Sequence, residues 1–133
     1  MSTRTLRVLV VDDHEIVRRN ICQLLVSQAD IEVICEAANG QEAVLRAREH
    51  RPDLVLMDVT MPTMNGLEPA RIIKQELPSI RVLMVSQHDS PPFMREALAV
   101  GASGYITKSA VGRDLIPQLR NLQYPNSTGK SGS

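Results

Sequence analysis

The chain alternates short, continuously apolar runs with longer segments in which apolar residues recur every three or four positions. Five such runs predict β-strands, because short runs rich in valine, isoleucine and leucine are typical of strands buried on both faces. They cover residues 6–11, 31–37, 53–58, 80–86 and 104–108. Only the second run half-alternates with polar residues, which predicts a strand nearer to the edge of a sheet.

Amphipathic segments follow the strands, and their apolar residues fall at helical spacing. The second helix is predicted to begin after Asn39, a favourable N-cap with Glu42 three residues further on. The third is predicted to begin near Gly66, because Pro69 is tolerated only in the first turn of a helix. The fourth is expected to end at Gly101.

The end of the chain holds a further helix and a polar tail. Leu115, Leu119 and Leu122 predict the helix. Pro117 lies about a turn inside it and removes a backbone donor, so a late start or a kink is expected. Residues 124–133 have no apolar periodicity and are interpreted as a disordered tail, a linker or a cloning remnant. One folded domain is therefore expected over residues 1–123.

Five β–α repeats of this length predict an α/β fold, in which helices cover both faces of a parallel sheet. Right-handed crossovers make a doubly wound sheet the natural arrangement. Ligands of such sheets bind at the carboxyl ends of the strands, near the point where the strand order reverses.

Polar side chains follow four of the five predicted strands. The first strand ends at Asp12 and Asp13, the third at Asp58, the fourth at Ser86 and the fifth at Lys108. Because the carboxyl ends of parallel strands meet at one edge of a sheet, we expect these five side chains to converge there.

Each of these residues also has an ordinary structural explanation. Asp12 and Glu15 have the spacing of a capping box, and Asp58 could cap a turn. Ser86 could bond to the backbone, and Lys108 could be a surface charge. Their joint occurrence at one edge nevertheless favours a functional site.

Crowded carboxylates call for a cation, because each pair about 4 Å apart costs roughly 4 kcal/mol at an effective dielectric near 20. An all-oxygen ligand set favours Mg²⁺, and no cysteine or histidine stands at zinc-ligand spacing. A metal, an ammonium and a hydroxyl around one carboxylate suit phosphoryl transfer, and a carboxylate can accept a phosphoryl group as an acyl phosphate. Asp58 is therefore predicted to meet a phosphoryl donor.

The overall charge of the chain argues against one class of function, nucleic-acid binding. The 133 residues include 15 Lys and Arg against 15 Asp and Glu, so the chain lacks the basic footprint of a nucleic-acid binder. Cys22 and Cys35 fall within apolar patterns and are expected to be buried, reduced thiols. No apolar stretch predicts a membrane span or a signal peptide, so a soluble, cytoplasmic protein is expected.

The motifs at the strand ends resemble the receiver domain of bacterial two-component response regulators. The resemblance covers residues 4–122 and rests on LVVDDHE, LVLMDVTMPTMNGLE, VLMVSQHD and GASGYITK, which occur in the family's order and spacing. The stretches VDDHEIVRR and GASGYITKSA are most similar to receivers of NarL/FixJ-type transcriptional regulators. The resemblance implies a flavodoxin-like strand order 2-1-3-4-5.

The resemblance also implies a role for each site residue. Asp58 would accept a phosphoryl group from the phosphohistidine of a sensor histidine kinase. Asp13 would bind Mg²⁺ directly and Asp12 mainly through water, with Asp58 and the backbone carbonyl of Thr60 as further ligands. Lys108 would pair with a phosphoryl oxygen. Such a chain is a phosphoacceptor switch that assists its own phosphotransfer and dephosphorylation.

The same family pattern implies a relay from the site to a distant face. Ser86 would move toward the phosphoryl group, and Tyr105 would rotate inward as it does so. Thr60 and His88 would influence the lifetime of the phosphorylated state. The expected output is a homodimer or effector contact, and DNA binding would belong to a further C-terminal domain.

Two positions depart from the family. Ser109 follows Lys108 where the family often has proline, which leaves open whether the Lys108–Ser109 peptide bond is cis. Pro117 lies in the helix that commonly carries dimer contacts, which puts the usual dimer mode in question.

Other readings fit the residues less well. A haloacid-dehalogenase-type phosphatase would need aspartate where Thr60 stands, and the GKS at residues 129–131 lacks the glycine and preceding strand of a phosphate-binding loop. Flavin binding is disfavoured because the DDHE after the first strand would repel a phosphate. The open alternative is a phosphorylation-independent adaptor that keeps the fold.

Overall fold

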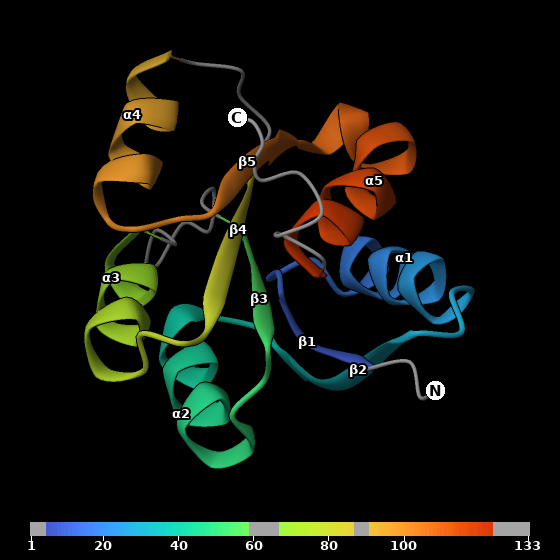
Figure 1. The fold of residues 1–133 in the computed structure, drawn as a ribbon, viewed down its shortest axis with the longest axis horizontal. Helices are drawn as coiled ribbons and strands as arrows, with labels where there is room; N and C mark the ends of the chain where they lie inside the picture. Colours follow the sequence, from blue (N-terminus) through green and yellow to red (C-terminus); the bar gives the residue numbers. More distant parts are fainter. Residues whose placement is uncertain (1–4, 59–66, 87–90, 124–133) are drawn as a thin grey trace.

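Five parallel strands form one sheet in the order β2-β1-β3-β4-β5 (Figure 1), as the resemblance implied. The structure is a computed structural model that describes residues 5–58, 67–86 and 91–123. The strands are β1 (Leu6–Val11), β2 (Ile31–Ala37), β3 (Leu54–Asp58), β4 (Arg81–Ser86) and β5 (Gly104–Thr107). The helices are α1 (Glu15–Val26), α2 (Gly40–His50), α3 (Leu67–Glu76), α4 (Pro91–Ala99), the 3₁₀ turn η1 (Lys108–Ala110) and α5 (Val111–Gln123).

Helices cover both faces of the sheet, which gives three layers (Figure 1). α1 and α5 lie on one face, and α2, α3 and α4 lie on the other. Each face has its own apolar core: Leu25, Leu115 and Leu119 pack on the α1–α5 side, and Ala47 and Ile73 pack on the opposite side. The doubly wound α/β fold expected from the sequence is confirmed.

Local signals in the sequence account for several element boundaries. The half-alternating second strand is the edge strand β2. Asn39 caps α2, because its Oδ1 accepts a hydrogen bond from the Glu42 N–H at 2.9 Å. Pro69 lies in the first turn of α3, and Gly101 follows α4 with a φ of +98°. A positive φ at this place is available to glycine at little cost.

The last helix differs from the expectation. α5 begins at Val111, directly after η1, so Pro117 lies in its interior and the expected late start is wrong. Leu115 and Leu119 are fully buried on either side of the proline, which favours a continuous helix here. The carbonyl of the exposed Arg113, four residues before Pro117, loses a helical donor where water is accessible.

The described residues bear on three further points from the sequence. They contain no cis peptide bond, so the Lys108–Ser109 bond is trans. Cys22 and Cys35 are free thiols, as expected, but both are only partly buried. No helix in the described ranges has the length and apolar character needed to cross a membrane. The proposed tail over residues 124–133 lies outside the described residues.

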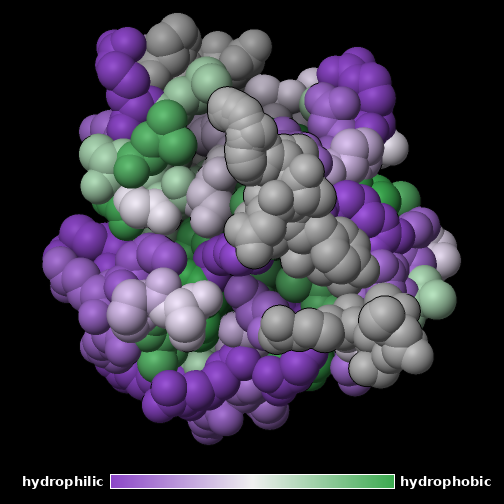
Figure 2. Space-filling model, viewed as in Figure 1, coloured by the Kyte–Doolittle hydropathy of each residue, from purple (hydrophilic) through white to green (hydrophobic). Residues whose placement is uncertain are grey.

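Large apolar side chains are exposed on several helices in the described parts of the chain. Met94 and Leu98, both on α4, are 38% and 58% exposed. Figure 2 shows hydrophobic surface in the upper left of the molecule, where α4 lies. This helix therefore offers an apolar face to solvent.

Candidate functional site

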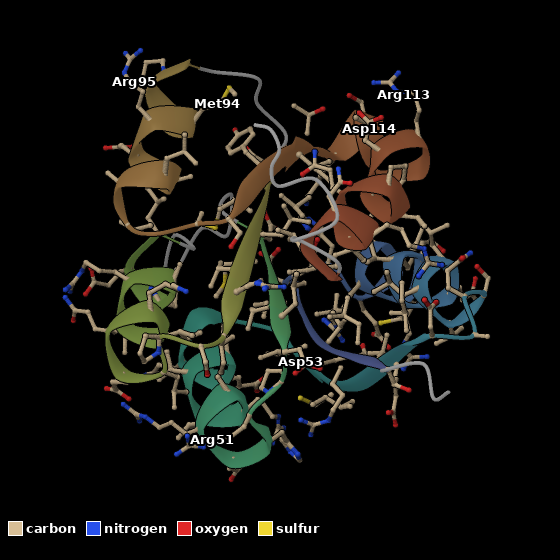
Figure 3. The ribbon with its side chains drawn as sticks, in the orientation of Figure 1. Arg51, Asp53, Met94, Arg95, Arg113 and Asp114 are labelled. Carbon is tan, nitrogen blue, oxygen red and sulfur yellow. The ribbon has the colours of Figure 1, made fainter. Side chains whose placement is uncertain are left out.

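The predicted site residues lie at the end of the sheet where the strands finish. Asp58 is the last residue of β3, Ser86 is the last residue of β4, and Lys108 follows β5 directly. In Figure 3 this end is in the upper centre of the view, below Met94 of α4 and Asp114 of α5, whereas Asp53, which precedes β3, lies lower down. The parallel register brings the strand ends together, since Asp58 pairs with Val85 and Ser86 with Thr107.

Three of these polar side chains are buried rather than turned toward bulk water. Asp12 and Asp58 are each 1% exposed, and Ser86 is fully buried. Buried carboxylates cost free energy unless they are paired or bind a cation, so this end of the sheet is built around charge compensation.

Lys108 supplies part of that compensation. Its Nζ lies 3.2 Å from Asp58 Oδ2, to which it donates a hydrogen bond, and 3.3 Å from Asp12 Oδ2. One ammonium thus stands between two buried carboxylates that come from different strands. Burial acts to lower the pKa of Lys108, but the attraction of Asp58 and Asp12 outweighs it and raises the pKa.

The backbone and one carboxylate oxygen of Asp12 are held on several sides. Its N–H donates to the Ala37 carbonyl at 3.1 Å, and its Oδ1 accepts from the His14 N–H at 2.8 Å. Its carbonyl accepts from Arg18 Nη1 at 2.7 Å. Oδ2 has no hydrogen-bond partner among the described residues; Lys108 lies within ion-pair distance of it without making an aligned hydrogen bond.

The protonation of Asp12 reflects this setting. Burial raises the pKa of its carboxyl, the hydrogen bond from the His14 N–H opposes the rise, and the negative charge of Asp58 adds to it. Lys108 also opposes the rise. Burial therefore outweighs the stabilisation that the His14 N–H and Lys108 give to the charged carboxylate, and the pKa of Asp12 is raised.

The donors around Asp12 fit a hard cation such as Mg²⁺. Asp12, Asp13 and His14 each offer a ligand atom, and these atoms lie within 4.8 Å of one another. Asp13 is the more exposed carboxylate, and His14 Nδ1 lies 3.1 Å from its Oδ1. Asp12 Oδ2 is buried and accepts no hydrogen bond from the described residues, so a cation would satisfy it, and carboxylate oxygens are the ligands that Mg²⁺ prefers.

The structure also decides between some of the ordinary explanations of these residues. α1 begins at Glu15 with His14 as its N-cap, and no side chain caps it, so Asp12 and Glu15 do not form a capping box. Lys108 is not a free surface charge, since its side chain is 15% exposed and pairs with two carboxylates.

The remaining predicted residues are placed as follows. Tyr105 on β5 is partly buried and packs against the core on the α2–α4 side of the sheet. Tyr105 pairs with Met84 of β4, and Ser86 pairs with Thr107, two positions further along β5. Thr60 and His88 lie outside the described residues.

A pair of residues to which the sequence assigned no role also lies beside the site. The side chain of Arg18 is only 14% exposed and donates a hydrogen bond to the Asp12 carbonyl. Glu36, near the end of β2, accepts from Arg18 Nε at 2.8 Å. The ion pair could not be predicted because its two residues are far apart in the sequence. The one indication was the polar Glu36 between apolar residues at the end of the predicted strand.

Comparisons with known proteins agree with this geometry. The family model described as "Response regulator receiver domain" matches residues 8–120. The response regulator protein VraR of Staphylococcus aureus is 43% identical over 116 residues, which are 87% of this chain and 56% of that relative. The chain therefore spans about half the length of the curated relatives that it matches.

Solved structures give the same result. A two-component response regulator of the LuxR family from an Aurantimonas species has a TM-score of 0.87 at 36% identity, with 92% of this chain and 87% of that chain covered. The signal receiver domain of the response regulator NarL from Mycobacterium tuberculosis has a TM-score of 0.86 at 29% identity, with 93% and 100% covered.

Proposed function

Because the chain belongs to the response regulator receiver domain family, we propose that it is a phosphorylation-dependent switch in which Asp58 accepts the phosphoryl group. Receiver domains are signalling switches of two-component systems and not conventional enzymes. The observation that supports the proposal most is the Lys108 ammonium, held 3.2 Å from Asp58 and 3.3 Å from Asp12. A phosphorylation-independent adaptor would have no need of this buried, charged arrangement.

The proposed step is a transfer from a phosphohistidine of a sensor histidine kinase, or from a small acyl phosphate. A carboxylate oxygen of Asp58 forms the new bond to phosphorus as the bond from phosphorus to the imidazole nitrogen breaks. The electron pair of the broken bond stays on the imidazole, which then takes up a proton; with an acyl phosphate, the P–O bond breaks instead and the carboxylate leaves with the electron pair. Attack of water on phosphorus later returns the carboxylate and releases inorganic phosphate, which resets the switch.

Lys108 is the group of this chain that stabilises the transferred charge. Its ammonium already contacts Asp58, so it can move from the carboxylate to a phosphoryl oxygen without a large change in position. The family assigns Mg²⁺ to this step, and the bound ion would neutralise charge on the phosphoryl oxygens. Asp12, Asp13, Asp58 and the Thr60 carbonyl are its proposed ligands.

The output is proposed to pass through Ser86 and Tyr105. Ser86 is buried at the end of β4, where its hydroxyl can reach a phosphoryl group on the neighbouring strand. Tyr105 stands on the adjacent β5, with α4 and α5 on either side. The exposed Met94 and Leu98 of α4 supply apolar surface for a homodimer or an effector on the same side of the molecule. Thr60 and His88 are proposed to tune the lifetime of the phosphorylated state.

The proposed partners follow from the family. A sensor histidine kinase supplies the phosphoryl group, and the chain works beside the kinase's catalytic domain in the cytoplasm. We propose residues 1–123 as the receiver unit and residues 124–133 as a tail or a linker. A solved LuxR-family relative from Staphylococcus aureus is described as a DNA-binding response regulator. Any DNA binding here would belong to a separate domain of a longer protein.

The test is intact mass spectrometry after incubation with acetyl phosphate and Mg²⁺. One phosphoryl adduct is expected, and it should be absent with EDTA and absent in Asp58→Asn. An unmodified chain under every condition would favour the phosphorylation-independent adaptor instead.

A further inference from the structure

Two neighbouring arginines of α1 differ sharply in their surroundings. Arg18 is 14% exposed, and it donates to the Asp12 carbonyl at 2.7 Å and to Glu36 Oε1 at 2.8 Å. Arg19 is 63% exposed and pairs only with Glu15, one turn earlier on the same helix, among the described residues. Arg18 therefore links α1, the loop after β1 and the end of β2, whereas Arg19 lies on the surface.

The acceptor atom of Arg18 occupies a special place. The Asp12 carbonyl belongs to the peptide plane that joins Asp12 to Asp13, since the next nitrogen in the chain is that of Asp13. Fixing this oxygen fixes the rotation of the plane, and with it the positions of the Asp13 nitrogen and Cα from which the side chain leaves the backbone. The Asp12 N–H is fixed independently by the Ala37 carbonyl at 3.1 Å.

Among the described residues, Arg18 is the donor to this carbonyl, which lies outside the helices and strands. It lies after the last residue of β1 and before α1, in a residue that is 1% exposed. A buried carbonyl without a partner is costly, so the loop would rotate to find another donor. Such a rotation would carry the Asp13 carboxylate away from Asp12.

Glu36 completes the arrangement through its charge. An unpaired guanidinium this close to Asp12 would repel a cation bound there. The Glu36 carboxylate compensates that charge and also fixes the guanidinium through Nε, which leaves Nη1 directed at the carbonyl. The pair thus holds the loop without adding net charge to the site.

We propose that Arg18, held by Glu36, is a positioning residue that orients the Asp12–Asp13 peptide so that both carboxylates can bind one Mg²⁺. This inference rests on the proposed function, because it assigns the cation to these two carboxylates. Outer partners that orient metal ligands typically change metal affinity by 10- to 100-fold when they are removed.

The test measures Mg²⁺ affinity directly, by isothermal titration calorimetry of the unphosphorylated chain. The variants are Arg18→Ala, Glu36→Gln and the double variant, with Arg19→Ala as the matched control one residue away on α1. The thermal midpoint of each is recorded, and the half-saturating Mg²⁺ concentration for phosphorylation by acetyl phosphate gives a second reading.

We expect about tenfold weaker Mg²⁺ binding in Arg18→Ala, with the half-saturating concentration raised by a similar factor. The phosphorylation rate at saturating Mg²⁺ should change much less, since Asp58 and Lys108 are untouched. Glu36→Gln, which keeps an acceptor for Nε but removes the charge, should weaken binding by about threefold. The double variant should bind Mg²⁺ no more weakly than Arg18→Ala alone, because both substitutions disrupt the same Arg18–Glu36 pair. Arg19→Ala should match the wild type.

Two results would overturn the inference. If Arg18→Ala binds Mg²⁺ as tightly as Arg19→Ala but has a lower thermal midpoint, Arg18 only stabilises the fold. If Arg18→Ala does not fold, the Mg²⁺ affinity of Glu36→Gln decides instead. An affinity equal to that of the wild type would overturn the claim that the Arg18–Glu36 pair positions the metal ligands. A wild-type chain that binds no Mg²⁺ is a different outcome, since it removes the proposed cation site itself.

Discussion

Lys108 Nζ donates a hydrogen bond to Asp58 Oδ2 at 3.2 Å, across a separation of 50 positions in the chain. The contact exists because β3 and β5 end at the same edge of a parallel sheet. It makes Lys108 both a counter-charge for the resting carboxylate and the nearest cation to a group transferred onto it.

Replacing Lys108 separates these two roles. Lys108→Ala should slow phosphorylation by acetyl phosphate about 100-fold, the typical effect of removing one charge-stabilising donor. Without Mg²⁺ it should also lower the free energy of unfolding by about 3 kcal/mol, because two buried carboxylates lose their shared cation. Millimolar Mg²⁺ should restore much of that loss, as measured by urea unfolding with and without the metal.

Arg113→Ala is the control for this prediction. Arg113 is a cation near the same end of the sheet, but it is 79% exposed and pairs with the adjacent Asp114 (Figure 3). It should leave both the rate and the stability unchanged. Equal effects of the two variants would show that general charge, and not the Lys108–Asp58 contact, is responsible.

Gly104 should resist substitution for reasons of space. A Cβ at this position would lie 2.8 Å from Leu83 Cδ1 and 3.0 Å from Gln118 Oε1, and Leu83 is fully buried. Gly104→Ala is expected to cost roughly 1–3 kcal/mol through overpacking between β5, β4 and α5. Gly112→Ala, on α5 with open space around it, should be neutral or stabilise the chain by up to about 1 kcal/mol. The free energy of unfolding of both variants can be measured by urea denaturation. Equal stability of Gly104→Ala and Gly112→Ala would contradict the close packing around Gly104.

Cys22 should be a poor nucleophile at neutral pH. Burial raises the pKa of its thiol to about 11, with Glu36 adding to the rise and Arg18 opposing it. In a Cys35→Ser background, alkylation by iodoacetamide should therefore be slow at pH 8 and accelerate up to about pH 11. The folded chain holds this proton more tightly than the unfolded chain, so its contribution to stability is present below pH 9 and is lost as the pH rises through 11. Alkylation at pH 8 at the rate of a free thiol would contradict this.

The sequence was sufficient to predict which residues gather at the site, because their positions depend only on where the strands end and on the parallel arrangement. Apolar runs locate the strands. The parallel arrangement of the backbone then brings Asp12, Asp58, Ser86 and Lys108 to one edge, independently of the side-chain conformations. Asn39 with Glu42 located the start of α2 equally well, since a capping box is a local pattern.

Contacts that depend on packing could not be predicted in the same way. Arg18 and Glu36 are 18 positions apart, and they meet only because α1 crosses the end of β2 at one particular rotation. The shared ammonium of Lys108 depends on the path of the chain through η1, which the pattern of apolar residues does not encode. The late start expected from Pro117 is wrong because the burial of Leu115 and Leu119 outweighs the local preference of proline.

The central claim is that Asp58 carries the phosphoryl group. The most direct measurement is to phosphorylate the chain with acetyl phosphate and Mg²⁺, reduce it with borohydride, and map the product by peptide mass spectrometry. Borohydride reduces an aspartyl phosphate to homoserine, so homoserine at position 58 and at no other acidic residue is the predicted result. Homoserine at Asp12 or Asp13, or at no position while the chain remains folded, would contradict it.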